Sequence, residues 1–302
     1  MGKKVLGMGN AVLDILVETS DSYLQKNNLS KGSMVLVEQE ESDKIVNDVT
    51  PTKKDSGGSV ANSMVGLSQL GNEVGFVGKV SDDKLGSKYE EGLKKENVDF
   101  YCMKKKEPLP TGTCLILVTP DSERTMCTFL GTAGKISEDD ISLDAINKSD
   151  MVFLEGYLWD EGDPKKAFDK AINNSKKTAM TLSDQFCVDR HKAYFLDLVK
   201  NKLDICFANE GEMMSLIDAK DFSEVINFSK EIKKHIIITR GENGAVSIKD
   251  NKIVEVESKK NLDILDLTGA GDLFASGYLD GYINNLSQVE CLEKGTEMSA
   301  KI

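Results

Sequence analysis

The chain has 302 residues, 40% of them hydrophobic, which is enough for one large α/β domain or for two ordinary ones. Its formal net charge of −12 disfavours a nucleic-acid partner, and no run approaches the roughly 18 apolar residues of a membrane span. Asp14 interrupts the first apolar stretch too early for a secretion signal, so we expect a cytoplasmic protein that does not act at a membrane.

None of the six cysteines forms a C-x-x-C pair, and three of them, Cys114, Cys127 and Cys206, lie inside apolar runs. These features predict buried free thiols rather than disulfides or a zinc site. The two histidines, His191 and His235, are isolated in the sequence, and we expect no metal cluster from them.

Short strands are predicted over 5–9, 11–18 and 31–38 from their apolar runs. Asp14 lies inside the second of them. A carboxylate among apolar residues needs a partner, and the hydroxyl groups of a substrate would supply one. A solvated strand face accounts for Asp14 equally well.

A glycine-rich turn over 55–59 opens a helical pattern over 60–70. Gly57 and Gly58 would let a ligand approach the backbone closely, and Asn62 offers it both a donor and an acceptor. A plain glycine-rich helix start has the same pattern, so the turn is only a candidate binding site.

Further strands are expected over 74–80, 99–105, 113–119 and 124–130, the last two joined by a hairpin turn. Strands that follow one another without a helix cannot all join a parallel sheet, so we predict a small β lid beside an α/β core. The lid would comprise residues 11–38 and 99–130, and the core residues 1–10, 39–98 and 131–302.

From residue 151 onward strands and helices alternate regularly, which is typical of a mainly parallel sheet with helices on both faces. Ligands bind such sheets at the carboxyl ends of the strands. Asp184, Asn209, Arg240 and Asp272 all follow strand ends, so one rim could gather them. The strands are expected over 151–154, 178–182, 205–208, 235–239, 244–248 and 253–256, and the helices over 164–174, 189–202 and within 210–233.

The most informative stretch is Asp-Leu-Thr-Gly-Ala-Gly-Asp, residues 266–272. Small residues at a helix start leave backbone N–H donors open, so Gly269, Ala270 and Gly271 would form an anion site. Asp272 in the first turn could accept the proton of a hydroxyl group, which suits phosphoryl transfer. An Asp in the first turn of a helix is also common without such a role.

Asn209 and Glu212, three residues apart at a strand–helix junction, could orient a water molecule on a magnesium ion that bridges phosphates. The same pair is the signature of a capping box, which is favoured when the pair is taken alone.

The order of these pieces resembles the ribokinase-like (PfkB) carbohydrate kinase family over nearly the whole chain. An Asp in an early lid strand is followed by Gly-Gly-x-x-x-Asn, Asn-x-x-Glu, Thr-Arg-Gly-x-x-Gly and Asp-x-Thr-Gly-Ala-Gly-Asp. Stretches such as Ser-Asp-Gln-Phe at 183–186 are most similar to the adenosine kinase branch. The resemblance implies a ribokinase-like fold and a kinase that uses ATP, Mg²⁺ and, as in many members, K⁺.

The resemblance also implies roles for individual residues. Asp272 matches the catalytic base, and Gly269, Ala270 and Gly271 match the anion hole for the transferred phosphoryl group. The positions that match the binding of sugar hydroxyls are Asp14, Gly58 and Asn62, with Gly57 beside them.

On the nucleotide side, Asn209 and Glu212 match the magnesium–water motif. Thr239 and Gly241 match the nucleotide loop, with Gly244 closing the turn. Asp266 and the carbonyl of Thr268 match one side of a monovalent-cation site, and Arg124 matches a lid residue that reaches toward phosphate.

The sequence departs from the family in two places. Leu267 stands where many members carry Thr, and the chain ends at Ile302 although the family continues through a further loop and helix. Those pieces complete the adenine pocket and the cation site, so we expect either that the chain is truncated or that both sites are partly missing.

The expected reaction is phosphorylation of the primary hydroxyl of a ribosyl-type acceptor, with adenosine favoured. A free sugar such as ribose, fructose or a sugar acid is the alternative, and a nucleoside-binding relative without turnover is the alternative that is not an enzyme. Phe129, Leu130, Tyr157 and Phe186 could form the walls for a base, or could be core. Exposed lid strands could pair with a second copy in a homodimer.

Overall fold

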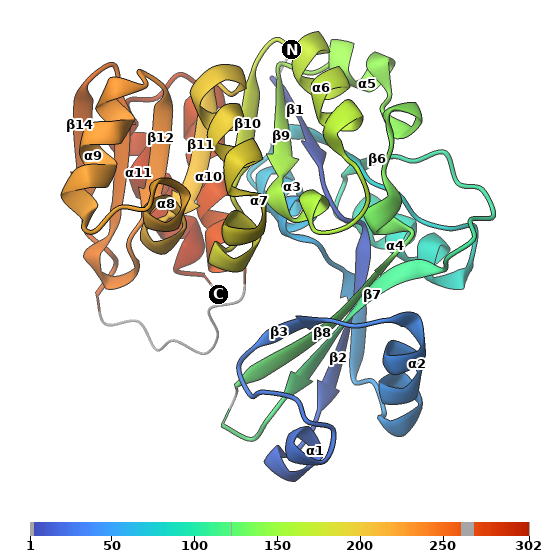
Figure 1. The fold of residues 1–302 in the computed structure, drawn as a ribbon. Coiled ribbons are helices and arrows are strands. Elements are labelled where there is room, and N and C mark those ends of the chain that lie inside the picture. The colour runs from blue at the N-terminus through green and yellow to red at the C-terminus, as the bar shows by residue number, and fades with distance from the viewer. Residues whose placement is uncertain (1–2, 122, 261–268, 302) are drawn as a thin grey trace.

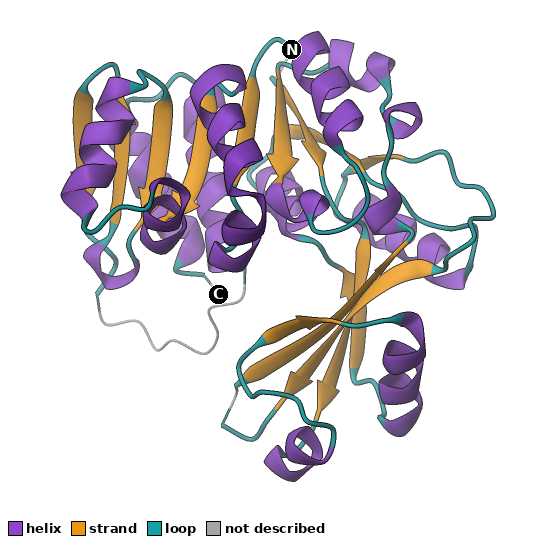
Figure 2. Cartoon of the chain, in the orientation of Figure 1, coloured by secondary structure: helices purple, strands orange, loops and turns teal. Residues whose placement is uncertain are grey.

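Two β-sheets organise the described residues, 3–121, 123–260 and 269–301, of the computed structural model (Figure 1). The larger sheet carries helices on both faces, and the smaller one projects below it in this view (Figure 2). This confirms the predicted α/β fold with a second, smaller sheet.

The large sheet has nine strands in the order β14-β13-β12-β11-β10-β9-β1-β5-β6. All neighbours from β12 to β6 are parallel, and β13 and β14 are added antiparallel at one edge. The parallel strands are nearly continuous apolar runs because helices cover both of their faces. The strands are β1 (Lys4–Met8), β5 (Glu73–Val77), β6 (Asp99–Tyr101), β9 (Met151–Glu155), β10 (Thr178–Thr181), β11 (Ile205–Asn209), β12 (His235–Thr239), β13 (Ala245–Lys249) and β14 (Lys252–Val256).

Alternate residues of these strands enter two separate hydrophobic cores. In β9, for example, Phe153 packs on one face and Leu154 on the other. One core is closed by α3 (Ser59–Gln69), α4 (Lys84–Lys95), α10 (Ala270–Ile283) and α11 (Gln288–Ser299), and the other by α5 (Leu143–Asn147), α6 (Lys165–Asn174), α7 (Gln185–Asp197), α8 (Glu210–Ile217) and α9 (Phe222–Glu231).

The strand order reverses at β1, which has β5 on one side and β9 on the other. A reversal of this kind opens a crevice beyond the carboxyl ends of the strands, where α/β sheets bind their ligands. Asn10 follows β1 and Glu155 ends β9, so both residues lie at this point.

The small sheet has five strands, of which one face is covered by helices. Leu24 and Ile45 from two short helices pack there against Ile15 and Leu115. The opposite face is also apolar, and among the described residues its cluster includes no α-helix but only Ala133 of a short helical turn. The strands run in the order β3 (Met34–Leu36), β8 (Arg124–Gly131), β7 (Thr111–Val118), β2 (Val12–Glu18) and β4 (Lys53–Ser56), and the helices are α1 (Asp21–Lys26) and α2 (Gln39–Asp48).

The predicted division into core and lid is wrong at two places. Residues 99–101 form β6, which pairs with β5 in the large sheet, although 99–130 was predicted to belong to the lid. Residues 39–48 form α2, which packs on the small sheet, and 53–56 form its strand β4, although 39–98 was predicted to be core. The polar sequence of β4 hides its strand, because its pairing with β2 rather than its own composition creates it.

Several boundaries also differ from those predicted. The helix expected from 189 begins at Gln185, and α1 and α2 were not predicted. All six cysteines are free and five of them are buried, as expected. Across the described ranges, no helix is both long and apolar enough to cross a membrane. Short helical turns complete the chain: η1 (Ala133–Lys135), η2 (Glu138–Asp140), η3 (Gly156–Trp159), η4 (Leu198–Lys202) and η5 (Gly241–Asn243).

Candidate active site

A pocket of about 1050 Å³ lies between the carboxyl ends of the large sheet and the small sheet. Its core side combines polar residues at the starts of α3 and α10 with the apolar side chains of Phe153, Phe207 and Phe274. Its lid side comes from the helix-free face of the small sheet. The predicted site residues that line it are Asp14, Gly58, Asn62, Arg124, Asn209, Glu212, Thr239, Gly269, Gly271 and Asp272.

The start of α10 opens into this pocket. Gly269 caps the helix with φ +81°, a left-handed conformation that favours glycine. A Cβ atom placed on Gly271 would meet no atom within 4 Å, so the first turn faces open space. Ala270, the first helical residue, is not among the lining residues. Free N–H groups and the positive end of the helix dipole therefore form an anion cradle here.

Asp272 lies in the first turn of α10, directly beside this cradle. Its carboxylate accepts hydrogen bonds from the Ser59 hydroxyl at 2.6 Å and from the Asn62 side-chain amide at 3.1 Å. Burial raises the pKa of Asp272 to about 6, against the lowering effect of these two donors. The carboxylate is thus ionised at neutral pH and is fixed in orientation by α3.

The backbone around Asp272 is held by two further hydroxyl groups. Ser276 Oγ lies 2.9 Å from the carbonyl oxygens of both Asp272 and Ser63, and Ser63 Oγ donates to the Asp272 carbonyl at 3.1 Å. The small residue Gly66 permits this close approach, because a Cβ there would lie 2.4 Å from Ser276 Oγ. The starts of α3 and α10 therefore form one rigid unit.

Asp14 faces the same space from β2. Gly57 lies so close that a Cβ atom would come within 2.2 Å of the Asp14 carboxylate, which requires glycine at this position. Burial, together with the charges of Asp272 and Asp55, raises the pKa of Asp14 to about 7, and the Arg124 cation opposes this rise. The structure thus brings Asp14 and Asp272 into electrostatic contact across the predicted acceptor site.

The sequence analysis missed Glu155, a third carboxylate that lines the pocket. It is 1% exposed and accepts hydrogen bonds from the backbone N–H groups of Val60 and Asn10, at 2.9 and 3.2 Å. Burial raises its pKa to about 8. The signal was available, since Glu155 is the charged end of an apolar strand that leads to the sheet edge.

The Asn209–Glu212 pair forms the capping box that the spacing predicts. Asn209 Oδ1 accepts from the Glu212 N–H at 2.8 Å, and the Glu212 carboxylate accepts from the Asn209 N–H at 3.0 Å. Glu212 is 4% exposed, and burial raises its pKa to about 7. Both residues nevertheless line the pocket, so the cap also places oxygen atoms at its edge.

The other strand-end residues are not gathered at the pocket. Arg240 pairs with Glu210 at 2.8 Å and lies 3.8 Å from the centre of the Phe222 ring. Asp184 caps α7 and accepts from the Tyr157 hydroxyl at 3.0 Å. Gly241 and Gly244 belong to the turn at η5 and are not lining residues.

Of the proposed base walls, Leu130 and Tyr157 line the pocket. Phe129 packs in the core on the opposite face of the lid, which is the alternative left open for it. Phe186 is 72% exposed and does not line the pocket, so it is not a base wall. Asp266, Leu267, Thr268 and Ile302 lie outside the described residues, and the predicted cation site with them.

The fold and the site together define a phosphotransferase of the carbohydrate kinase type. Residues 25–302 match the pfkB family carbohydrate kinases, and the chain belongs to this family. The chain is 34% identical to an adenosine kinase from Sinorhizobium meliloti, with a TM-score of 0.91 over 99% of this chain and 93% of that one.

Two further relatives carry different substrates in their names. A "probable sugar kinase protein" from Rhizobium etli CFN 42 shows the same 34% identity, TM-score of 0.91 and coverage of 99% and 93%. A 5-dehydro-2-deoxygluconokinase from Clostridium perfringens is 26% identical over 264 residues, which cover 82% of this chain and 77% of the relative. The family is therefore established, and the acceptor has to be argued from the site.

Proposed function

We propose that the protein is an ATP-dependent kinase that phosphorylates the primary hydroxyl of a ribosyl-type acceptor, with adenosine favoured and Asp272 as the base. The observation that carries the proposal is the fixed carboxylate of Asp272 beside the open start of α10. One group can take a hydroxyl proton while the other holds the phosphoryl group.

In this proposal the acceptor lies between Asp14, Gly58 and Asn62. As the hydroxyl oxygen bonds to the γ-phosphorus of ATP, its proton passes to Asp272 and the bond to the β,γ-bridging oxygen breaks, which releases ADP. The N–H groups at Gly269 and Gly271 stabilise the charge on the phosphoryl oxygens. Closure of the small sheet over the bound acceptor would exclude water, which otherwise competes as acceptor.

The nucleotide would lie along Asn209, Thr239 and Gly269. The oxygen atoms of Asn209 and Glu212 take part in the capping box, so they suit a Mg²⁺ that keeps its own water molecules. In this arrangement the two side chains would orient those water molecules and not bind the ion directly. A bound Mg²⁺ would neutralise phosphate charge. The expectation of a K⁺ site involving Asp266 and Thr268 stays a prediction.

The lid wall favours a nucleoside as acceptor. Met34, Leu36, Ile116, Met126 and Leu130 line the pocket from the lid, beside the polar Arg124 and Thr128. The apolar side chains suit the flat faces of a base better than a small polyol. The name of the Sinorhizobium meliloti relative agrees with this choice. The names of the other two relatives favour the alternative, a kinase for a free sugar or sugar acid.

A panel of acceptors tests the proposal by release of ADP. Adenosine, other nucleosides, ribose, fructose and a 5-dehydro-2-deoxy sugar acid are compared, with D272N as the control for acceptor-independent ATP hydrolysis. The highest kcat/KM is expected for adenosine. Turnover confined to free sugars would reject the nucleoside, and calorimetric binding of adenosine without ADP release would indicate a binding protein without turnover.

We also propose that two copies of the chain pair through the lid. The small sheet ends in the edge strands β3 and β4, whose outer backbone groups are a template for a further strand. Light scattering across a concentration series measures the mass, and a monomer at all concentrations would reject the pairing. The cytoplasmic location stays a proposal, which the six free cysteines support, because reducing compartments keep thiols unpaired.

A further inference from the structure

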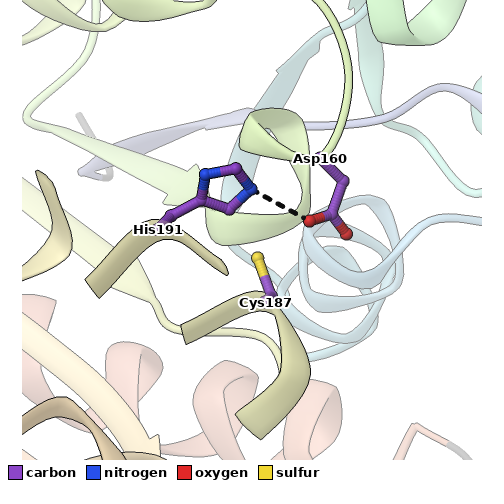
Figure 3. A group of neighbouring side chains, drawn as sticks. All are labelled: Asp160, Cys187 and His191. Atoms are coloured by element: carbon purple, nitrogen blue, oxygen red, sulfur yellow. Dashed lines mark hydrogen bonds and ion pairs between the residues drawn. The ribbon is translucent and has the colours of Figure 1, made fainter. Parts of the chain in front are cut away.

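Three side chains that the kinase proposal does not use meet beside the pocket. Cys187 and His191 are four residues apart on α7, and Asp160 follows η3. One ligand atom from each lies within 4.8 Å of the others, and Figure 3 shows the sulfur atom facing the His191–Asp160 pair. Sequence spacing alone led us to expect no metal cluster from the histidines, whereas the fold brings His191 beside two further potential ligands.

The backbone of α7 is distorted at one residue of this group. His191 has φ −118° and ψ 18°, which is not helical, although the helix continues on both sides of it. Helix kinks usually lie at Pro or Gly, and His191 is neither. Here the kink accompanies a ring placed with its Nε2 atom 3.2 Å from Oδ1 of Asp160.

Burial and charge at the group also suit a cation. The Asp160 side chain is 2% exposed, and its carboxylate is paired with Arg190, whose Nη2 atom lies 2.7 Å away. The Arg190 side chain is 44% exposed, so it can turn into solvent when another cation takes its place. Asp160 also lines the large pocket, which gives water access to the group.

We propose that Asp160, Cys187 and His191 bind a borderline-soft divalent cation, Zn²⁺, with water as the fourth ligand. Ligand atoms around tetrahedral zinc lie about 3.5 Å apart, which follows from metal–ligand bonds of roughly 2.0–2.3 Å. The Asp160–His191 pair already has this spacing, so chiefly the sulfur atom has to move closer. A nitrogen, a sulfur and one carboxylate select zinc over magnesium.

When zinc binds, the S–H bond of Cys187 is replaced by a sulfur–zinc bond, and the charges balance. The Cys187 thiol loses its proton to solvent as the sulfur–zinc bond forms, and the thiolate and Asp160 together neutralise the ion. Burial raises the pKa of this thiol, a cost that zinc overcomes because coordination deprotonates thiols outright. Arg190 is released from Asp160 in the same step.

Cobalt(II) tests the site as a coloured substitute for zinc on the full chain. Titration is expected to give one thiolate-to-cobalt charge-transfer band at a 1:1 ratio, which Zn²⁺ removes and excess Mg²⁺ does not. The C187S variant should lose the band, and H191N should bind at least roughly 10-fold more weakly, the loss that removal of a mere outer-shell partner can cause. C102S, which alters a half-buried thiol elsewhere, is the matched control and should keep the band.

An opposite effect is expected from R190Q. Removing the cation that competes for Asp160 should tighten cobalt binding roughly 10-fold, the strength of a charge-assisted hydrogen bond. A purely structural Asp–His–Cys contact predicts no band in any variant. Absence of the band in the unaltered chain, or its survival in C187S, would overturn the proposal. Thermal unfolding checks each variant, and R190Q and H191N still decide the question if C187S does not fold. None of these readouts depends on kinase activity.

Discussion

The two sides of the pocket are built on different principles. On the core rim several polar side chains are fixed by named partners, as Asp272 is by Ser59 and Asn62. The lid wall alternates apolar side chains such as Leu36 and Met126 with the polar Arg124 and Thr128, and Leu36 is 41% exposed. The difference indicates that residues of the rim carry out the chemical step, which requires exact atomic positions. The lid would select the acceptor, for which shape and polarity suffice.

The largest effect is expected from Asp272→Asn on the rim. The amide keeps the hydrogen-bonding volume but cannot take a proton, so kcat should fall by roughly 10²–10⁴-fold while acceptor binding persists. Stopped assays of ADP release and calorimetry with the acceptor measure the two quantities. Asp169→Asn, on the surface of α6, is the matched control, and near-normal turnover in D272N would remove Asp272 from its role.

A methyl group at the anion cradle should lower kcat somewhat less than D272N does. Gly271→Ala places a Cβ in open space, so stability should hold or rise by about 0.5–1 kcal/mol. The same methyl group would displace the phosphoryl group, and a shift of about 1 Å can lower kcat by roughly 10²-fold. Thermal unfolding and kcat for ATP are the measurements.

Gly269→Ala is the control that separates the two effects. Gly269 has φ +81°, so a Cβ there strains the backbone by roughly 1–2 kcal/mol and should lower the melting temperature. If G271A turned over normally, the open start of α10 would not be where the phosphoryl group lies.

The rim could be predicted from the sequence far better than the lid. Gly-Gly-x-x-x-Asn and Gly-Ala-Gly-Asp are local patterns, and local geometry places Asn62 and Asp272 at helix starts whatever the rest of the chain does. The sequence does not indicate which helix starts lie next to each other in the fold. The Asn62–Asp272 contact joins residues 210 positions apart, and we had assigned Asn62 to the substrate alone.

The lid wall could not be predicted because both faces of its sheet are apolar. In β8 the even-numbered residues from Arg124 to Leu130 line the pocket, and Phe129 on the odd face packs toward α2. Alternation reveals two faces but not which of them a helix will cover. The same limit applies to Asp160, which reaches Cys187 and His191 only through the packing of η3 on α7.

The pH dependence of turnover should report on the rim. Burial raises the pKa of Asp272 to about 6, and the base works only when ionised, so activity should be lost as the pH falls through about 6. One pH unit below that value the rate should be about 10-fold below its plateau, since each unit is a tenfold change in the ionised fraction. Profiles of kcat/KM against pH measure this limb, and its persistence in the residual activity of D272N would assign it to another group.

The smallest effect is expected on the lid, where two adjacent residues of β3 form a matched pair. Leu36 lines the pocket and is 41% exposed, whereas Val35 is 38% exposed and does not line it. Leu36→Thr removes apolar contact with a base, a loss of about 1 kcal/mol that should raise the KM for adenosine roughly 5-fold, with kcat unchanged. Val35→Thr should leave both constants unaltered, because the same change is made on the other side of the strand. Equal KM values for the two variants would mean that the acceptor does not touch the lid wall, and the argument for a nucleoside over a free sugar would then lose its support.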